Sequence, residues 1–383
     1  MVNGQWLMVN GQCEYQSPVD YDIVLAGNFG EPRPYHFHGG IDVKTDNQEG
    51  KHIFSIADGY VSRLTVNMYG FGNAIYVSHP DGNTSVYCHL QRFADRYEQQ
   101  LQRTGKDTLS LVFSENQFPV KAGDLIAISG NTGHSTGPHL HLEIHDTKTW
   151  VMRDPLEFLG NVIADTVAPQ AHSFMAVPVR GEGVFNGGID KQTFGFGAPD
   201  TKVQSSVHQV SREFTAWGRV GFALWADDYS ELTYNHYGIR HTQLLVDGRE
   251  VFRSDVDSIP ISCQCEVNLW GDYNHWRRTR IWYMKSFKEP GMRLPLLHTD
   301  IHNGYVIFNE ERPYHLTYIL RDFQNNMSIY HFTVLGVPDR RVKPRASRHN
   351  GSLDSYRPFD SYRILDSYRL WRQCLWPLYT CRE

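Results

Sequence analysis

SGNTGHSTGPHLHLEIH, residues Ser129 to His145, is the stretch that decides the fold and raises the question of function. Three glycines and a proline punctuate its first half, and the second half alternates apolar with other residues. This alternation predicts a β-strand in which residues two apart share a face. His139, His141 and His145 therefore project together, and the intervening leucines face the opposite side. Two histidines in HxH after a glycine-rich loop favour a metal site.

A second group of metal-binding residue types stands about a hundred residues earlier, in YHFHGGIDV from Tyr35 to Val43. Gly39 and Gly40 disfavour a helix, so a loop entering a strand is expected. His38, Asp42 and one histidine of HxH would give the three protein ligands that a catalytic zinc ion usually has, with a fourth position open to water. Strand geometry alone does not say which histidine of HxH binds the metal.

A third motif, VYCHL, predicts a strand that presents Tyr87 and His89 on one face. Tyr87 is a candidate to orient a substrate carbonyl or, alternatively, a packed core residue. The glycine-rich loop before His139 also has the composition of a phosphate-binding loop. No Lys-Ser/Thr follows it and no helix is predicted there, which argues against that function.

The motifs HGGID, YCHL and GNTGHSTGPHLHLEI resemble, in this order, those of the M23 zinc metallopeptidases of the lysostaphin and LytM type. The resemblance implies that His38, Asp42 and His141 bind Zn²⁺, and that His139 and His89 are active-site histidines that do not bind it. It also implies a metalloendopeptidase that hydrolyses peptide bonds in peptidoglycan stem peptides or cross-links by attack of a zinc-activated water. His145 is expected to be a bystander or to support a ligand.

The resemblance covers about residues 20 to 160. The one departure in length is the segment Gln91 to Gln117, where FADRYEQQLQR has helical periodicity. This insertion is a candidate to line or cap the substrate groove. Two other functions compete with a peptidase. A non-catalytic M23-like scaffold would usually lack the metal ligands, which are present here. The facial triad of a non-haem iron oxygenase normally starts with HxD or HxE rather than the HxxxD of His38 and Asp42.

Short alternating segments and turn signals predict a mainly β chain. We expect an N-terminal extension (1–19), an antiparallel M23-like peptidase domain (20–165), an immunoglobulin-like β-sandwich (166–338) and a low-complexity tail (339–383). The tail carries LDSYR, FDSYR and LDSYR, together with Cys374 and Cys381, which could pair. In the second domain, GDYNHWRRTRIWYM interleaves aromatic and basic residues. It predicts either contact with a glycan or protein, or simply a core and its rim.

The composition is that of a globular protein. The 383 residues are 40% hydrophobic with a formal charge of -5, which gives no support for a nucleic-acid partner. No apolar run reaches the roughly 18 residues of a transmembrane helix. The first residues do not read as a secretory signal, so a location in the cell envelope, periplasmic or secreted, is expected only from the substrate that the resemblance implies.

Overall fold

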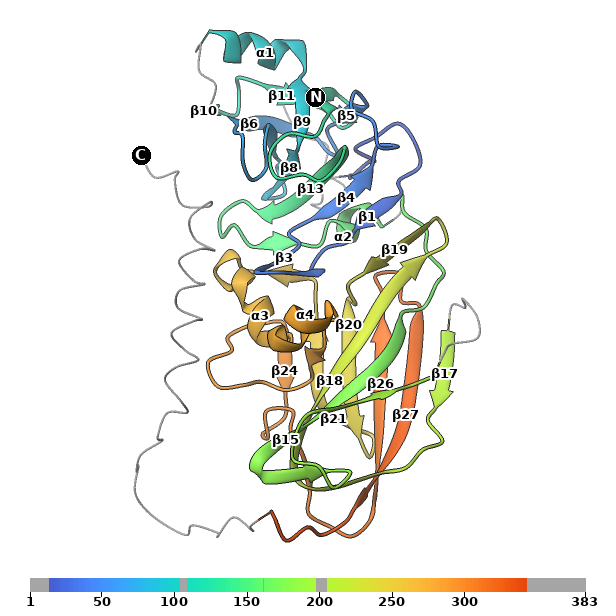
Figure 1. Cartoon of the computed structure of the whole chain (residues 1–383). Coiled ribbons are helices and arrows are strands. Elements are labelled where there is room, and N and C mark those ends of the chain that lie inside the picture. Colours follow the sequence, from blue (N-terminus) through green and yellow to red (C-terminus); the bar gives the residue numbers. More distant parts are fainter. Residues whose placement is uncertain (1–13, 104–108, 161, 198–204, 343–383) are drawn as a thin grey trace, which may run out of the picture.

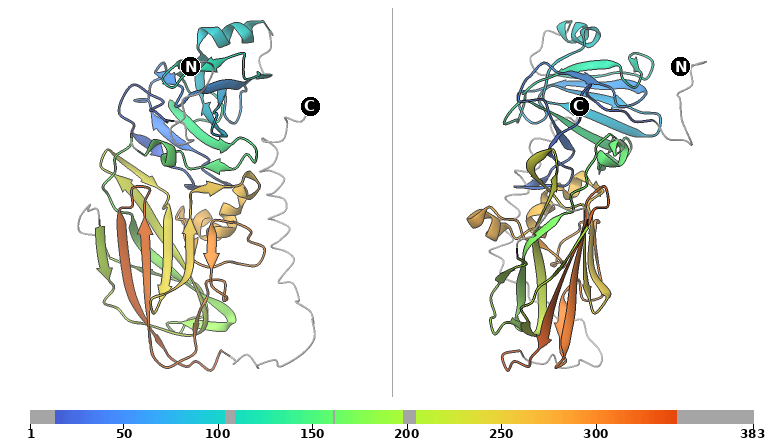
Figure 2. Two further views of the ribbon diagram at one scale, coloured as in Figure 1. Left: turned by 180° about the vertical axis from the view of Figure 1, so that it is seen from behind. Right: turned by 90° about the vertical axis from the view of Figure 1, so that its right-hand side faces the viewer.

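The structure is a computed structural model, and it describes residues 14–103, 109–160, 162–197 and 205–342. These residues form two β-rich regions stacked along the long axis of the molecule (Figures 1 and 2). We call residues 14–160 the first region and residues 162–342 the second region. The mainly β fold that the sequence predicts is therefore confirmed.

The main sheet of the first region has antiparallel pairing between all neighbouring strands. In spatial order its strands are β1 (Leu25–Gly27), β4 (Ile41–Lys44), β13 (His139–Asp146), β8 (Asn83–Cys88), β7 (Ala74–Ser78), β6 (Gly59–Val66) and β10 (Leu109–Val112). A further strand, β11 (Pro119–Val120), pairs with β6. Strands β7 and β8 form a hairpin, joined by a turn in which Gly82 has a φ of 87°.

A smaller sheet covers one face of the main sheet. Its strands are β5 (His52–Phe54), β12 (Leu125–Ser129) and β9 (Leu90–Phe93). Side chains of both sheets form one core that includes Ile53, Ile126, Leu64 and Leu142. Tyr87 is fully buried in this core.

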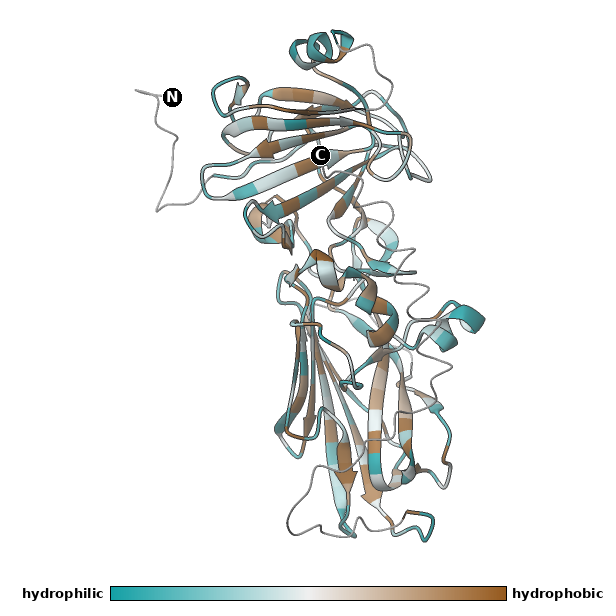
Figure 3. Ribbon diagram, turned by 90° about the vertical axis from the view of Figure 1, so that its left-hand side faces the viewer, coloured by the Kyte–Doolittle hydropathy of each residue, from teal (hydrophilic) through white to brown (hydrophobic). Residues whose placement is uncertain are grey.

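Helix α1 (Asp95–Gln102) follows β9, as the helical periodicity predicts. Its buried residue Tyr97 packs edge-on against Phe118, at 5.5 Å between ring centroids. The rest of the helix is mostly hydrophilic (Figure 3), and α1 lies at the end of the molecule away from the second region (Figure 1). The helix is therefore a peripheral addition to the small sheet.

The second region is built on one long sheet that packs over itself. Its strands, in spatial order, are β16 (Gln192–Gly195), β15 (Gln170–Phe185), β18 (Phe214–Ser230), β27 (Met327–Gly336), β26 (Pro313–Arg321), β20 (His241–Val246), β21 (Arg249–Asp255) and β24 (Leu297–Thr299). The shorter strands β17 (Ser205–Gln209), β19 (Thr233–Tyr237), β23 (Met284–Lys285) and β25 (Val306–Phe308) pair with β27 or β18.

An aromatic core lies between strands of this sheet. Phe174 of β15 stacks on Phe332 of β27 with ring centroids 4.5 Å apart, and Phe222 of β18 lies 6.0 Å from the same ring. The strands β15 and β18 thus pack across the core from β26 and β27. The immunoglobulin-like assignment of this region stays a prediction, as do the domain boundaries.

The two regions are joined by strand pairing and by shared cores. The short strand β14 (Met152–Arg153) pairs with β13 on one side and with β22 (Ser258–Ile259) on the other. Helix α2 (Leu156–Leu159) follows β14. Phe37 and Met152 belong to the core of the second region, and Tyr237 belongs to the core of the first. The two regions are therefore packed against each other.

Among the described residues, no helix has the length and apolar character needed to span a membrane. The DSYR repeats, Cys374 and Cys381 lie outside the described residues, so their predicted roles stay predictions.

Candidate metal centre

Strand pairing brings the three predicted ligands together. His38 follows β3 (His36–Phe37), Asp42 lies in β4, and His141 lies in β13 directly opposite Asp42. His38 Nε2 is 3.0 Å from Asp42 Oδ1 and 3.0 Å from His141 Nδ1, and the last two atoms are 2.8 Å apart. All three residues are at most 6% exposed. Three donor atoms from segments a hundred residues apart thus meet at one buried point.

The two glycines between His38 and Asp42 permit this approach. A Cβ atom on Gly40 would lie 2.1 Å from the carbonyl oxygen of Leu142, and a Cβ on Gly39 would lie 2.6 Å from Glu143 Oε1. Real Cβ atoms do not make contacts this short, so a side chain at Gly40 would push β4 away from β13, and one at Gly39 would displace the carboxylate of Glu143. The loop between β3 and β4 also confirms the prediction that His38 enters a strand rather than a helix.

Hydrogen bonds on the far side of each ring orient the lone pairs inward. His38 Nδ1 donates to the carbonyl oxygen of Asn28 at 2.7 Å, so Nε2 of the neutral ring carries a lone pair. His141 Nε2 donates to Glu143 Oε1 at 2.9 Å, so Nδ1 is the corresponding acceptor. With Asp42 Oδ1, three acceptors converge without a donor, and such a cluster requires a proton or a metal cation. Two imidazole nitrogens and one carboxylate oxygen are donors that suit zinc, with bonds of about 2 Å.

The titration behaviour of the site follows from this convergence. Burial alone would raise the pKa of Asp42, but electrostatic attraction to His38 and the close approach of His139 and His141 hold it well below its usual range. Burial would lower the pKa of His141, yet its hydrogen bonds to Asp42 and Glu143 raise it to about 9. A proton therefore occupies the centre when no metal does, and metal binding must displace it.

Glu143 links the cluster to a third histidine. One of its oxygens accepts from His141, and the other accepts from His145 Nε2 at 2.5 Å. The ring of His145 stacks on Trp150, with centroids 4.5 Å apart. His145 thus supports a candidate ligand through a carboxylate. Sequence reasoning missed Glu143, although it has the same strand parity as the three histidines.

Arg33 fixes the second oxygen of the candidate carboxylate ligand. Its guanidinium binds Asp42 Oδ2 at 2.7 Å and lies 3.6 Å from Glu31 Oε2. Arg33 belongs to β2 (Pro32–Arg33), which pairs with β3 in a small hairpin. No sequence pattern indicates this contact, because it depends on how the hairpin folds back over β4.

The two other predicted histidines lie beside the cluster. His139 Nδ1 donates to the carbonyl oxygen of Gly137 at 2.8 Å, and its Nε2 is 3.4 Å from Asp42 Oδ1. His89 Nδ1 donates to the carbonyl oxygen of Thr132 at 2.8 Å, and the rings of His89 and His139 are 4.8 Å apart. Both rings therefore keep Nε2 available on the side of the cluster.

One expectation about the surroundings is wrong. Tyr87 does not share a face with His89, because His89 adopts a φ of 59°, which ends the alternation of β8. The hydroxyl of Tyr87 instead accepts from the backbone nitrogen of Ile56 at 2.8 Å, in the core. Of the insertion, β10 pairs with β6 at the sheet edge opposite β1 and β4. A role of the insertion in lining or capping the substrate groove stays a prediction. Phe71 is the aromatic residue that stacks on His141, at 6.0 Å.

Comparisons with known proteins cover the part of the chain that contains this centre. Residues 36–153 match the sequence profile of Peptidase family M23. A protein of Haemophilus influenzae named uncharacterized metalloprotease is 34% identical over 108 residues, which are 28% of this chain and 18% of that protein. The DD-carboxypeptidase/endopeptidase Mpg of Neisseria meningitidis is 31% identical over 109 residues, 28% of this chain and 20% of that protein. Peptidoglycan DD-endopeptidase ShyC of Vibrio cholerae is 33% identical over 135 residues, 33% and 26% respectively. The chain thus spans about a quarter or less of the length of these relatives.

Proposed function

We propose that the chain is a zinc-dependent metalloendopeptidase that hydrolyses peptide bonds in peptidoglycan stem peptides or cross-links, because residues 36–153 match Peptidase family M23. One observation carries the proposal: the lone pairs of His38 and His141 converge with a carboxylate oxygen of Asp42 within 3.0 Å. The names of two relatives, a DD-carboxypeptidase/endopeptidase and a peptidoglycan DD-endopeptidase, support the choice of substrate.

In this proposal His38, Asp42 and His141 bind the metal. A bound zinc ion supplies Lewis acidity toward the scissile carbonyl and lowers the pKa of a coordinated water toward neutrality. Asn28 and Glu143 hold the two rings in the tautomer that presents a lone pair to the centre. Arg33 holds the carboxylate of Asp42 in one orientation.

His139 and His89 carry the proton transfers of the reaction. In each ring Nδ1 is committed to a backbone carbonyl, so Nε2 is the atom that takes a proton from the attacking water or gives one to the leaving amine. In the described chain, the acidic residues at this cluster are the candidate ligand Asp42, Glu143 behind His141, and Glu31 beside Arg33. The two histidines are therefore the general acid and base that the site offers.

The test is muralytic activity on purified sacculi, with mass spectrometry of the released muropeptides. His38→Ala and His141→Ala should each lower activity by at least 10³-fold. His36→Ala is the matched control, because this exposed ring lies two residues before His38 and hydrogen-bonds to the carbonyl oxygen of Pro34 rather than to Asp42. Retained activity in both ligand variants would refute the proposal.

Metal analysis of the purified protein separates the competing functions. One equivalent of zinc together with released muropeptides agrees with the peptidase. Bound iron would indicate the oxygenase-type triad instead, and a protein that binds no metal and releases nothing would be the non-catalytic scaffold. A substrate in the cell wall places the protein in the cell envelope, periplasmic or secreted.

We also propose that the second region contacts the glycan of the same substrate. Tyr273 of α4 (Tyr273–Thr279) stacks on Trp276, and Trp276 stacks on Trp282, with centroids 5.6 and 5.3 Å apart. These rings are partly exposed, and the hydroxyl of Tyr273 donates to that of Tyr35, three residues before His38. Partly exposed aromatic stacks of this kind are typical of recognition surfaces. Trp276→Ala should weaken binding to sacculi without slowing cleavage of a short soluble peptide.

A further inference from the structure

A second cluster of carboxylates lies at the junction of the two regions. Asp165 belongs to the linker before β15, Asp228 lies in β18, and Asp322 directly follows β26. One oxygen from each lies within 4.8 Å of the other two. Their exposures are 7%, 3% and 3%. Three acids from separate segments are thus buried against one another.

No basic side chain compensates these charges in the described part of the chain. Asp165 accepts from the backbone nitrogen of Val167 at 3.0 Å, and Asp322 accepts from Asn326. Asp228 Oδ1 is buried and has no hydrogen-bond partner among the described residues. Leaving a buried carboxylate unpaired costs several kcal/mol in general, so the cluster calls for a cation or for protons.

Asn326 gives a second and independent observation. This residue is 1% exposed, and its Nδ2 donates to Asp322 Oδ2 at 2.6 Å and to the carbonyl oxygen of Asp165 at 3.0 Å. Its Oδ1 has no partner in the described chain. An unsatisfied neutral carbonyl oxygen therefore belongs to the buried residue that hydrogen-bonds to Asp322 and to the backbone of Asp165. An amide carbonyl beside carboxylates is a typical part of a calcium site.

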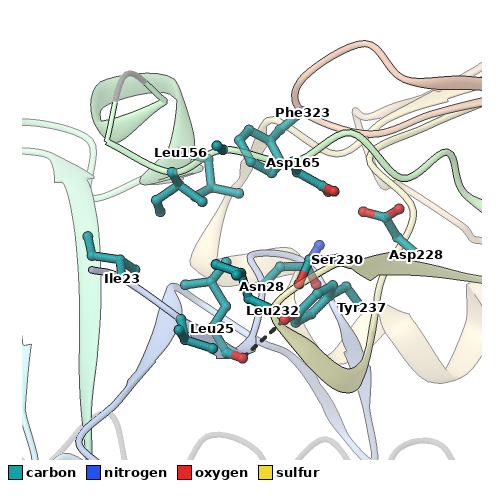
Figure 4. Close-up of a pocket in the computed structure, with 13 residues that line it drawn as sticks. Ile23, Leu25, Asn28, Leu156, Asp165, Asp228, Ser230, Leu232, Tyr237 and Phe323 are labelled. Atoms are coloured by element: carbon teal, nitrogen blue, oxygen red, sulfur yellow. Dashed lines mark hydrogen bonds between the residues drawn. The ribbon is translucent and has the colours of Figure 1, made fainter. Parts of the chain in front are cut away.

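A small cavity adjoins the cluster. It has a volume of about 20 Å³ and is lined by Asp165, Asp228, Ser230, Tyr237 and Asn28 together with apolar side chains. Figure 4 shows the carboxylates of Asp165 and Asp228 directed toward each other across this space. A volume of this size accommodates one water molecule or one ion.

We propose that Asp165, Asp228 and Asp322 bind a calcium ion that fastens the linker between the two regions. The donor set is all oxygen, which favours a hard cation over zinc, and flexible coordination by several carboxylates is characteristic of calcium. Gln324, in the same loop as Asp322, donates to the carbonyl oxygens of Gly160 and Ile163. The loop after β26 therefore already holds the linker, and the ion completes that attachment.

The charge balance supports the assignment. Burial raises the pKa of Asp165 to about 7 and that of Asp322 to about 6, and it raises the pKa of Asp228 well above its ordinary value. In each case a neighbouring carboxylate or the loss of water opposes ionisation. Three carboxylates that resist ionisation alone can all ionise around a divalent cation.

The test uses the full chain, freed of metals on a chelating resin and then given one equivalent of zinc. Calorimetric titration with calcium chloride should show one site, and saturating calcium should raise the unfolding temperature by about 5 °C. Asp228→Asn should abolish this rise, while its unfolding temperature without calcium should equal or exceed that of the unaltered chain, because an uncompensated charge is gone. Asp190→Asn, which changes an exposed aspartate of the same region, should keep the full response.

Three results would overturn the proposal. The first is that the unaltered chain shows no calcium site by calorimetry, a measurement that does not depend on any variant folding. The second is that Asp228→Asn and Asp190→Asn respond to calcium alike, which would indicate non-specific binding. The third is an equal response to magnesium chloride, which would exclude calcium as the selected ion.

Discussion

Replacement of Glu143 by glutamine tests how much the carboxylate behind His141 contributes to metal binding. Glu143 is 4% exposed, and its two oxygens receive the N–H groups of His141 and His145 at 2.9 and 2.5 Å. Glutamine has nearly the same shape but no charge. Its carbonyl oxygen can still accept from His141. His145 can satisfy the new amide by moving its proton to Nδ1, which faces the carbonyl oxygen of Trp150 at 3.5 Å.

The variant therefore removes the charge while the hydrogen bonds can be remade. A negative charge on the far side of a ligating imidazole raises the basicity of its metal-binding nitrogen, and loss of such a partner typically lowers metal affinity by about 10–100-fold. That corresponds to about 1.4–2.7 kcal/mol of binding free energy. We expect Glu143→Gln to lie within this range, and Glu143→Ala to lose more because two N–H groups would be left without an acceptor.

Zinc affinity is measured by competition with a fluorescent chelator of known affinity at one fixed pH. Glu115→Gln is the control, since Glu115 is an exposed residue of the same region and the substitution is identical. Activity of Glu143→Gln should recover largely at saturating zinc, because Glu143 positions a ligand and does not contact the substrate. A zinc affinity within twofold of the unaltered chain would refute the reasoning.

Three further predictions follow from the first region. Gly40→Ala should lower the free energy of unfolding by about 1–3 kcal/mol and weaken zinc binding, because its Cβ would meet the carbonyl oxygen of Leu142; chemical denaturation should show no comparable loss for Gly137→Ala, where a Cβ meets no atom within 4 Å. Tyr87→Phe should cost about 1–3 kcal/mol of stability but leave kcat unchanged, since the hydroxyl serves the core; a fall in kcat would restore a role at the site. Burial raises the pKa of Asp154 to about 7, so the neutral carboxyl stabilises the fold fully below the unfolded pKa near 4, and this contribution is lost as the pH rises through 7. The free energy of unfolding of Asp154→Asn should therefore fall less between pH 4 and pH 8, by up to about 4 kcal/mol, and an unchanged pH profile would contradict the shift.

Strand alternation predicted much of the centre because the relevant residues lie on regular strands. The face that carries His139 and His141 follows from the two-residue period of β13, and the same period holds over the whole of Leu140 to Ile144. Spacing alone did not distinguish the two histidines as ligands; the resemblance made that choice. In the structure, His141 is directly opposite Asp42 in the β4–β13 register, and that register is a long-range property.

Strand alternation does not predict side-chain directions where the backbone leaves regular geometry. His89 follows β8 in a left-handed conformation, and this single φ of 59° turns its ring toward the cluster while Tyr87 stays in the core. A non-glycine residue in that conformation is uncommon, so alternation is the natural but wrong expectation. The contact of Arg33 with Asp42 could not be predicted either, because a two-residue strand such as β2 has no periodicity to recognise.

The second region supports the metal centre directly, through Asn28. The backbone carbonyl of Asn28 accepts the proton of His38 Nδ1 at 2.7 Å and so fixes the tautomer of that ring. The side chain of the same residue donates to the carbonyl oxygen of Gly238 at 2.8 Å and accepts from the nitrogen of Gly238 at 2.9 Å. Gly238 follows β19 of the second region, so two hydrogen bonds across the junction hold the residue that orients a candidate ligand. The orientation of a ligating histidine depends on the group that accepts the hydrogen bond of its other ring nitrogen. A displacement of the second region would therefore disturb His38 before His141, because Glu143, which supports His141, lies in the same strand as His141.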